Sequence, residues 1–377
     1  MDSEQLGYLV ISELIMTLNI AYPLIEPTAS IKEDGPISTQ YKKHFGQIGL
    51  NEFVSYKEQN MVKTNYQYRP GIIETFGRIF SPPEIGKYSA KIKNICDSIN
   101  TSIGISLIYA EHIDGGIVPM ALALEECGYT RYGKGYNLFD PSPDVHRKGK
   151  YVIICGDPKL SPDIDSDMKH LVAENNSNGE QIKVVIISRT GAEGLDFKCI
   201  RQVHIMEPWY NMNRIEQIIG RGVRNCSHKN LPIEMRNVEI YLHGSYIDDK
   251  EEAIDMYLYR FAEKKAINTG KVTRLIKRNA VDSALNIKQM DFGIEQLNVS
   301  IKQSSSTGKT HPNYIIGDKP LSSLCDYMES CQYMSNHEKE ALIVKMQSNN
   351  TDYSTYNELH VKYGFSKIKL LIKNLFK

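Results

Sequence analysis

The sequence predicts an α/β fold in which helices flank a mainly parallel β-sheet, and two observations carry that prediction. Short apolar runs typical of β-strands recur between residues 103 and 243, and amphipathic helical patterns separate several of them. Some runs are apolar throughout, as in VVII at residues 184–187, which fits strands that crossover helices bury on both faces. The strand candidates are GISLIYA, YVIIC, IKVVIIS, QVHIM and NVEIYLH, so we expect at least five strands.

The first of these strand candidates is followed within a few residues by a helix. The segment DGGIVPMALALEECG places Ile117, Met120, Ala121 and Leu124 on one apolar stripe. The helix is expected to end at Gly128, because glycine is the residue most common just after a helix.

Changes in composition divide the chain into four segments. Residues 1–100 mix an apolar helical stretch with a polar, turn-rich one and are interpreted as an interdomain connector. Residues 101–245 contain the α/β domain, and residues 246–298 are a predicted helical appendage with an apolar stripe. Residues 299–377 begin with a stretch rich in Ser and Gly, which predicts a linker before a small C-terminal segment.

Charge and cysteine content exclude some classes of protein. Lys plus Arg and Asp plus Glu both total 45, so the formal net charge is zero and any nucleic-acid site must be local. The apolar stretch at residues 8–25 is interrupted by Glu13, Thr17 and Asn19, and we expect neither a signal peptide nor a membrane span. Seven scattered cysteines are typical of reduced thiols in a core, which predicts an intracellular protein.

Residues 182–228 hold two signatures, and the first is a loop that follows a buried strand. The strand ends at Ser188 and passes directly into RTGAEGLD, residues 189–196. Glycines leave backbone amides uncovered at the carboxyl edge of a parallel sheet, where open α/β folds bind ligands. A loop in this position can hold a phosphate or a ribose. A tight turn between strand and helix is the plainer alternative for this loop taken alone.

The second signature is a helix with two arginines. Gln217, Arg221 and Arg224 are spaced so that they are expected on adjacent turns of one helix face, with Gly220 between them. A guanidinium is always charged and planar, so two of them on a rigid helix suit the negative charge of a transferring phosphoryl group. A solvated arginine face is the alternative when this helix is considered alone.

Taken together, the two signatures resemble a known family. Residues 188–196 resemble helicase motif V, residues 217–224 match the QxxGRxxR pattern of motif VI, and GISLIYA resembles motif IV. The chain is thereby similar to the C-terminal, second RecA-like domain of superfamily 2 helicases. The wording EPWYNMNRIEQIIGRGVRNCSH is most similar to helicase-like ATPases of poxviruses and giant viruses, a group that includes the small subunit of the viral early transcription factor. Swi/Snf-type translocases are wider relatives.

The resemblance implies a RecA-like sheet and a role for each motif residue. Arg224 and Arg221 would be arginine fingers at the γ-phosphate of ATP, and Gln217 would couple the nucleotide state to the opposite domain. The residues expected near the nucleotide are Gly194, Asp196 and Gly220, and those expected at the nucleic-acid backbone are Thr190 and Gly191. Mg²⁺ would be held mainly by the first lobe, and no metal site is expected in this chain.

The 377 residues depart from the family because they contain neither a GxxxxGK[ST] loop nor a DExx box. QSSSTGKT at residues 303–310 ends like a P-loop, but Gln303 stands where glycine is required and no apolar strand precedes it. The leading hypothesis is therefore a helicase C-terminal lobe that acts in trans with a polypeptide carrying the missing motifs and does not turn over ATP alone. On this view residues 1–100 are the connector or a remnant of the first lobe.

Other hypotheses about function remain open at this point. The chain could be a non-catalytic module that binds nucleic acid or a transcription complex, or a fragment of a split gene. The expected partners are nucleic acid, with DNA favoured, a protein carrying the first lobe, and transcription machinery; no membrane partner is expected. If the protein is viral, we expect it in the virion or the cytoplasmic virus factory.

Several further residues have simpler interpretations. We expect Asp163, Asp165 and Asp167 to mark a helix start, and His204 to lie in the core. Trp209 could stack on a base or brace a loop, and bracing is favoured. Cys325 and Cys331 fit no zinc pattern with His337.

Overall fold

The computed structural model describes residues 8–25, 41–59, 63–133, 137–189, 194–279, 299–316 and 320–330. The chain divides into two compact units. The first comprises residues 1–261 and 302–312, and the second comprises residues 262–301 and 313–377. The first unit contains the whole of the large sheet, so any site at an edge of that sheet belongs to it.

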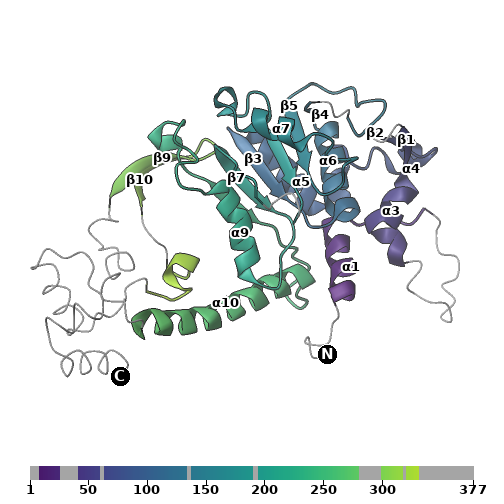
Figure 1. Ribbon diagram of the computed structural model, residues 1–377. Coiled ribbons are helices and arrows are strands. Elements are labelled where there is room, and N and C mark those ends of the chain that lie inside the picture. Colours follow the sequence, from purple (N-terminus) through teal and green to yellow (C-terminus); the bar gives the residue numbers. More distant parts are fainter. Residues whose placement is uncertain are drawn as a thin grey trace, which may run out of the picture. The chain divides into compact units, whose positions relative to one another are not determined.

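A six-stranded parallel sheet forms the centre of the first unit, which confirms the predicted fold class (Figure 1). The strand order is β4-β5-β6-β3-β7-β8. All five strand candidates are strands, and the three-residue β4 was not predicted because it is too short to show an apolar pattern. The strands are β3 (Ile105–Tyr109), β4 (Tyr129–Arg131), β5 (Gly149–Ile154), β6 (Val184–Ile187), β7 (Ile200–Ile205) and β8 (Glu239–Leu242).

Helices cover both faces of this sheet, and alternate residues along each strand point to opposite sides. In β6, Val184 and Ile186 belong to the core that includes helices α5 and α6, whereas Val185 and Ile187 belong to the core that includes α7 and α9. The apolar run is therefore buried on both faces, as predicted. The four helices are α5 (Ala90–Thr101), α6 (Val118–Glu126), α7 (Ile164–Leu171) and α9 (Met212–Gly222).

Helix α6 differs from its prediction in one respect. It ends before Gly128 as expected, and that glycine has φ +98° and lies so close to His146 that a Cβ atom would stand 2.1 Å from the carbonyl oxygen. However, every residue of α6 is buried, not only the stripe of Ile117, Met120, Ala121 and Leu124. The other side of the helix is therefore covered by a part of the chain that the periodicity of α6 could not reveal.

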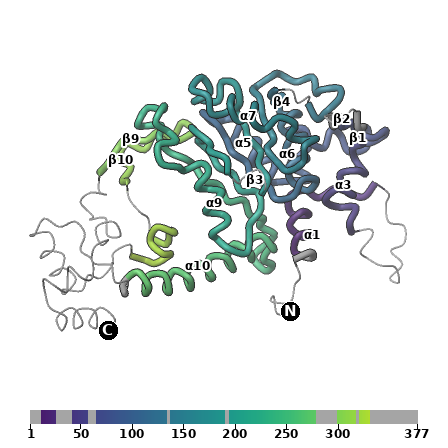
Figure 2. The backbone as a smooth tube through the Cα atoms, in the orientation of Figure 1, coloured from purple at the N-terminus to yellow at the C-terminus, as the bar shows by residue number. Residues whose placement is uncertain are grey.

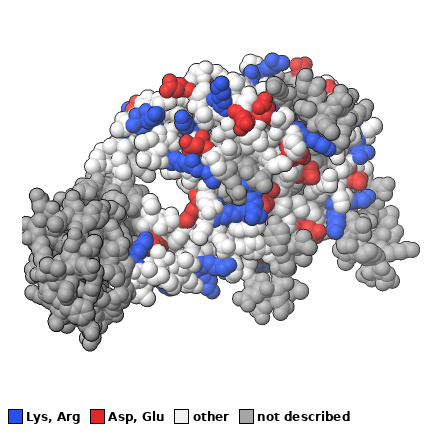
Figure 3. Space-filling view, in the orientation of Figure 1, with Lys and Arg blue, Asp and Glu red and all other residues white. Residues whose placement is uncertain are grey.

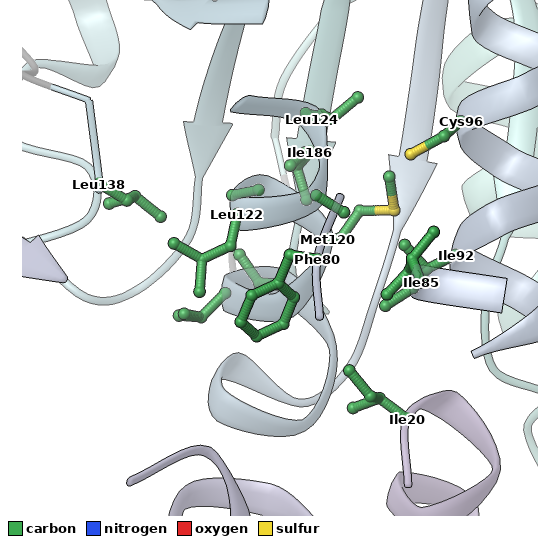
Figure 4. Packing of buried hydrophobic residues seen from close by; sticks show 14 of the residues in the cluster. Ile20, Phe80, Ile85, Ile92, Cys96, Met120, Leu122, Leu124, Leu138 and Ile186 are labelled. Atoms are coloured by element: carbon green, nitrogen blue, oxygen red, sulfur yellow. The ribbon is translucent and has the colours of Figure 1, made fainter. Parts of the chain in front are cut away.

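The covering part is the segment before residue 101. Ile20, Phe80 and Ile92 share one hydrophobic core with Met120 and Leu122 of α6 (Figure 4). The expected boundary at residue 100 is therefore not a boundary between compact units, and Figure 2 shows this N-terminal part, in purple and blue, continuous with the body that holds the sheet. Its elements are α1 (Tyr8–Asn19), η2 (Lys42–His44), α3 (Gly46–Phe53), β1 (Val54–Gln59), β2 (Lys63–Tyr68), α4 (Ile72–Phe76) and η3 (Ile85–Lys87).

The segment after the sheet is more regular than predicted. Helix α10 (Ile254–Asn279) lies in the expected appendage, but residues 300–315, predicted as a linker, form a two-stranded sheet of β9 (Ser300–Ser304) and β10 (Thr310–Ile315). QSSSTGKT lies in this hairpin and is followed by a strand instead of a helix, so it is not built like a P-loop. The remaining short helices are η4 (Ile113–Ile117), η5 (Glu174–Asn176), η6 (Ile233–Met235) and η7 (Ser323–Cys325).

The structure confirms two of the simpler interpretations and corrects a third. Asp163 caps α7 by accepting a hydrogen bond from the backbone N–H of Ser166, and His204 is fully buried. Five cysteines carry free thiols, whereas Cys325 is disulfide-bonded, which departs from the expectation that all thiols are reduced. Cys331, His337 and the lysine-rich C-terminal residues lie outside the described part of the chain.

Candidate functional site

A cleft of about 290 Å³ lies at the carboxyl ends of β3, β6 and β7, the edge at which parallel α/β sheets bind ligands. Polar and cationic side chains dominate its lining. Figure 3 shows basic and acidic side chains mixed over the face in view, in keeping with the zero net charge of the chain. The lining residues are Tyr109, Arg189, Trp209, Asn211, Asn213, Arg214, Gln217, Ile218 and Arg221.

Helix α9 supplies one wall of the cleft. Arg214, Gln217 and Arg221 all line it, as expected for positions separated by three and four residues along a helix. The opposite face of the helix is apolar, and Ile215 and Ile218 are buried in the core beneath the sheet. The amphipathic pattern of α9 therefore turns its polar face to the cleft.

The two motif arginines meet the loop after β6. Arg221 donates a hydrogen bond from Nη1 to the carbonyl oxygen of Leu195 at 3.1 Å. Arg224 forms an ion pair with Asp196, with 2.8 Å between Nη1 and Oδ1. These contacts bring the two sequence signatures together at one edge of the sheet.

Arg224 is not on the helix, and this corrects the prediction that it shares a face with Gln217 and Arg221. Helix α9 ends at Gly222, which packs so closely on β7 that a Cβ atom would lie 2.6 Å from Cγ2 of Val203. The next residue, Val223, has φ −111° and ψ 82° and cannot continue the helix. Arg224 therefore reaches the loop from the segment after α9 and does not line the cleft.

The remaining predicted site residues have different environments. Gly194 has φ +77°, in the left-handed region, and neither it nor Gly220 has a neighbouring atom within 4 Å of the place where a Cβ would stand. The backbone of both residues therefore faces open space. The Asp196 side chain is 61% exposed. Thr190 and Gly191 lie outside the described residues.

Comparisons with known proteins agree with this geometry. The model of the helicase conserved C-terminal domain matches residues 160–226. This segment of the chain is therefore similar to helicase C-terminal domains. The matched segment contains β6, β7 and α9, which carry both signatures. Other strands of the sheet lie outside the match in the sequence, with β3 and β5 before it and β8 after it.

Several curated proteins that are similar to the chain come from viruses. The chain is 31% identical over 212 residues to a putative helicase of invertebrate iridescent virus 3, covering 53% of this chain and 21% of the relative. It is 25% identical to a putative ATP-dependent RNA helicase of Acanthamoeba polyphaga mimivirus, covering 79% of the chain and 29% of the relative. A termination factor homologue of African swine fever virus is 29% identical to the chain, and the match covers 63% of this chain and 38% of the relative. The chain thus spans between about a fifth and two fifths of these relatives' lengths.

Solved structures with some likeness include the C-terminal part of the Fun30 ATPase domain, with a TM-score of 0.32 and 16% identity. That match covers 48% of this chain and 47% of the other. The structure of T4 UvsW has a TM-score of 0.29 and 14% identity, covering 47% of this chain and 32% of the other.

The cleft also contains residues that the motifs did not predict. The guanidinium carbon of Arg214 lies 3.8 Å from the centroid of the Trp209 ring, and Tyr210 packs edge-on against the same ring. This supports the interpretation of Trp209 as a brace, because one face of its ring is already covered. Arg214 precedes Gln217 by three residues and Arg221 by seven, so helical spacing from motif VI could have identified it.

Two acidic residues follow the strands beside this stack, and one of them contacts Arg214. Glu111, just after β3, forms an ion pair with Arg214 and accepts a hydrogen bond from the Tyr109 hydroxyl at 2.5 Å. Burial raises the pKa of Tyr109, and the hydrogen bond to Glu111 raises it further. Glu207, just after β7, is 2% exposed, and burial raises its pKa above that of an ordinary glutamate.

In the described part of the chain no helix is both long and apolar enough to cross a membrane.

Proposed function

We propose that this chain is the second RecA-like lobe of a nucleic-acid-dependent ATPase and that it acts on ATP held by a lobe carrying the P-loop and DExx box. In this proposal Arg221 and Arg224 are arginine fingers, and Gln217 couples nucleotide state to the opposite lobe. The residues that lie close to the nucleotide are Gly194, Asp196 and Gly220. Thr190 and Gly191 contact the nucleic-acid backbone, and Mg²⁺ is held mainly by the first lobe.

The observation that supports the proposal best is the meeting of both arginines with the loop after β6. Arg221 contacts Leu195 and Arg224 contacts Asp196 at the carboxyl edge of the sheet, beside a cleft that is lined by arginine and amide side chains. Planar cations held on a rigid scaffold stabilise the charge that develops on a transferring phosphoryl group. This arrangement supplies that part of the chemistry, whereas the P-loop chemistry belongs to the first lobe.

The ion pair between Arg224 and Asp196 does not prevent Arg224 from acting as a finger. Their side chains are 37% and 61% exposed, and pairs of this kind contribute only about 0–1 kcal/mol. Arg224 can therefore leave Asp196 for a phosphate at little cost when the lobes close. Asp196 is then released toward the ribose, which is the role that the motif implies.

Nucleic acid is proposed as the stimulating partner, with DNA favoured over RNA. One relative is described as a termination factor homologue, which supports viral transcription as the process involved. Because the relatives are viral, we place the activity in the virion or the cytoplasmic virus factory.

The proposal is tested by reconstitution. The full chain is mixed with a separately expressed first lobe that carries the P-loop and DExx box, and steady-state ATP hydrolysis is measured with duplex DNA, duplex RNA or no nucleic acid. We expect background turnover from the chain alone and DNA-stimulated turnover from the pair. Arg224→Ala should lower kcat of the pair about 10³-fold, with less effect on ATP affinity.

Two variants make this test specific. Arg224→Lys should fail nearly as badly, because lysine keeps the charge but loses the planar fork. Cys226→Ala is the matched control, since it lies two residues further along, is exposed and removes no charge. Wild-type rates with Arg224→Ala would contradict the arginine-finger role, and binding of nucleic acid without any turnover by the pair would favour the non-catalytic interaction module.

A further inference from the structure

Arg214 differs from the motif arginine Arg224 because its ion pair is largely shielded from solvent. It forms an ion pair with Glu111, and the two side chains are only 15% and 14% exposed. The flat face of its guanidinium covers Trp209 at 3.8 Å. A buried, paired and stacked guanidinium is poorly placed to bind a phosphate, because the binding would have to break these contacts first.

The contacts of Arg214 come from the ends of two strands. Glu111 follows β3, and Trp209 follows β7, which is the neighbouring strand in the sheet. The Tyr109 hydroxyl donates to Oε2 of Glu111, the same oxygen that pairs with Arg214. The Arg214 side chain therefore links the first turn of α9 to the carboxyl edge of the sheet.

Arg214 lies on the polar face of α9, which is turned to the cleft while Ile215 and Ile218 are buried in the core. Arg214, Gln217 and Arg221 share the face of the helix that lines the cleft. The first turn of α9 contains no acidic residue that would stabilise the start of the helix through its dipole. The ion pair of Arg214 with Glu111 links this turn to the chain just after β3.

Glu111 is held in turn by a second carboxylate. The backbone N–H of Glu111 donates to Oε2 of Glu207 at 2.8 Å, and Nδ2 of Asn19 donates to Oε1 of Glu207 at 2.5 Å. Asn19 is the last residue of α1, and its Nδ2 also donates to the carbonyl oxygen of Gly115. The two groups that contact the Glu207 carboxylate, the Glu111 N–H and the Asn19 amide, are both hydrogen-bond donors. A side chain at this position must therefore offer two acceptor oxygens to accept both hydrogen bonds.

We propose that Arg214 is a positioning residue of this cleft. Its ion pair with Glu111 fixes the orientation in which α9 presents Gln217 and Arg221 to the cleft. Glu207 connects this ion pair to the end of helix α1. This inference rests on the proposed function, since it says how the motif VI helix is set for catalysis. It also makes the N-terminal segment part of the machinery, because a displacement of α1 would reach the cleft through Asn19, Glu207 and Glu111.

The first test uses the chain alone. Trp209 is the single tryptophan, so intrinsic fluorescence reports on the cleft without a label. Arg214→Gln removes the cation from the ring, and we expect a change in the emission maximum and greater quenching by acrylamide. Arg260→Gln is the matched control, because Arg260 also forms an ion pair, with Glu252, and lies over the ring of Tyr257, but on an exposed surface. Identical spectra for wild type and Arg214→Gln would overturn the stacked geometry.

The second test is a double-mutant cycle in the reconstituted ATPase. Arg214→Gln should lower kcat about 10-fold with little change in KM for ATP, because it misplaces groups that act in the transition state. In an Arg221→Ala background the same change should cost less than about 2-fold, since its effect passes through α9. Equal effects in both backgrounds would overturn the positioning role. If Arg221→Ala and Arg224→Ala leave turnover unchanged, the proposed function fails instead, whereas the fluorescence result still stands.

Two further variants separate positioning from loss of the fold. Arg214→Lys keeps the pair with Glu111 and should recover part of kcat but not the wild-type fluorescence. Glu207→Gln presents a donor to a site with two donors and should lower kcat in the same direction as Arg214→Gln. Thermal unfolding is recorded for each variant. A loss of kcat that merely follows the loss of folded protein, with no recovery in Arg214→Lys, would contradict the proposal.

Discussion

Arg221 and Arg201 belong to the same α/β unit, but they lie at opposite edges of its sheet. Arg221 lines the cleft at the carboxyl edge, where it contacts the loop after β6. Arg201 is the second residue of β7, at the amino edge, and it is 1% exposed. Its guanidinium donates to Asn237 and to the carbonyl oxygen of Ser304, next to the β9-β10 turn. One arginine thus faces a cavity, and the other holds a later segment of the chain against the sheet.

The comparison teaches that residue type does not distinguish function from structure in this domain. Parallel strands end at the same edge, so the loops that follow them converge there and leave a cleft. The amino edge holds the loops that precede the strands, and here residues 302–312 of the β9-β10 hairpin pack against it. Variants at the two edges test this division, and the largest effect is expected at the cleft.

Replacement of the cleft arginine should affect turnover alone. Arg221→Ala should lower kcat of the reconstituted pair about 10²–10³-fold, because a guanidinium at the transferring phosphoryl group is lost. Its free energy of unfolding should stay within about 0.5 kcal/mol of wild type, as for other surface changes. Steady-state kinetics and urea unfolding measure the two effects. A large loss of stability in Arg221→Ala would show that Arg221, like Arg201, has a structural role.

Replacement of the amino-edge arginine should have the opposite effect. Arg201→Ala removes the hydrogen bonds to Asn237 and to the carbonyl oxygen of Ser304 and opens a cavity where a nearly fully buried side chain stood, so we expect a loss of about 3 kcal/mol in the free energy of unfolding. Turnover per folded molecule should be unchanged, because no group at the cleft is altered. The same urea and kinetic measurements apply, and reduced kcat at full folding would show that the two edges are coupled.

Acid should destabilise the sheet through a histidine pair on β7 and just after β8. Burial lowers the pKa of His204 to about 3 and that of His243 to about 4, and the two rings lie 3.1 Å apart at Nδ1 and Nε2. Unfolded histidines titrate near pH 6.5, so below that pH the unfolded chain binds protons that the folded chain does not. The free energy of unfolding should therefore fall as pH is lowered from about 6.5 toward 4.

A variant isolates this pH dependence, because other buried groups oppose it. Burial raises the pKa of Glu125 to about 7 and that of Asp167 to about 6, and both groups favour the folded state as pH falls. His243→Gln should therefore lose less stability than wild type between pH 7 and pH 5, by about 2 kcal/mol. Parallel pH profiles for the two proteins, from urea unfolding, would show that His243 is charged in the folded state.

The smallest effect is expected at Gly220. A Cβ atom there would meet no neighbouring atom, and alanine is a better helix former, so Gly220→Ala should stabilise the chain by about 0.5–1 kcal/mol. If the nucleotide approaches Gly220 closely, the same change should still raise KM for ATP in the reconstituted pair. A stabilised variant with the wild-type KM for ATP would contradict the proposal that Gly220 lies close to the nucleotide.

The sequence by itself determined the class of fold and the meeting of the two motifs. Continuous apolar runs such as Val184 to Ile187 predict strands buried on both faces, and parallel strands force their following loops to one edge. The contacts of Arg221 with Leu195 and of Arg224 with Asp196 follow from these two rules. Both rules are local or topological, so a single sequence can express them.

Only the tertiary structure decided what surrounds the motifs. Helix α9 ends at Gly222, which packs against Val203 of β7, so Arg224 lies beyond the helix, and no spacing within the motif records this. Described residues before 101 share a core with the sheet and bury α6 on every side, and residues 302–312 pack at the amino edge. Asn19, Glu111 and Glu207 come together from distant parts of the chain. Such contacts depend on how separate elements pack, and helical or strand periodicity describes only one element at a time.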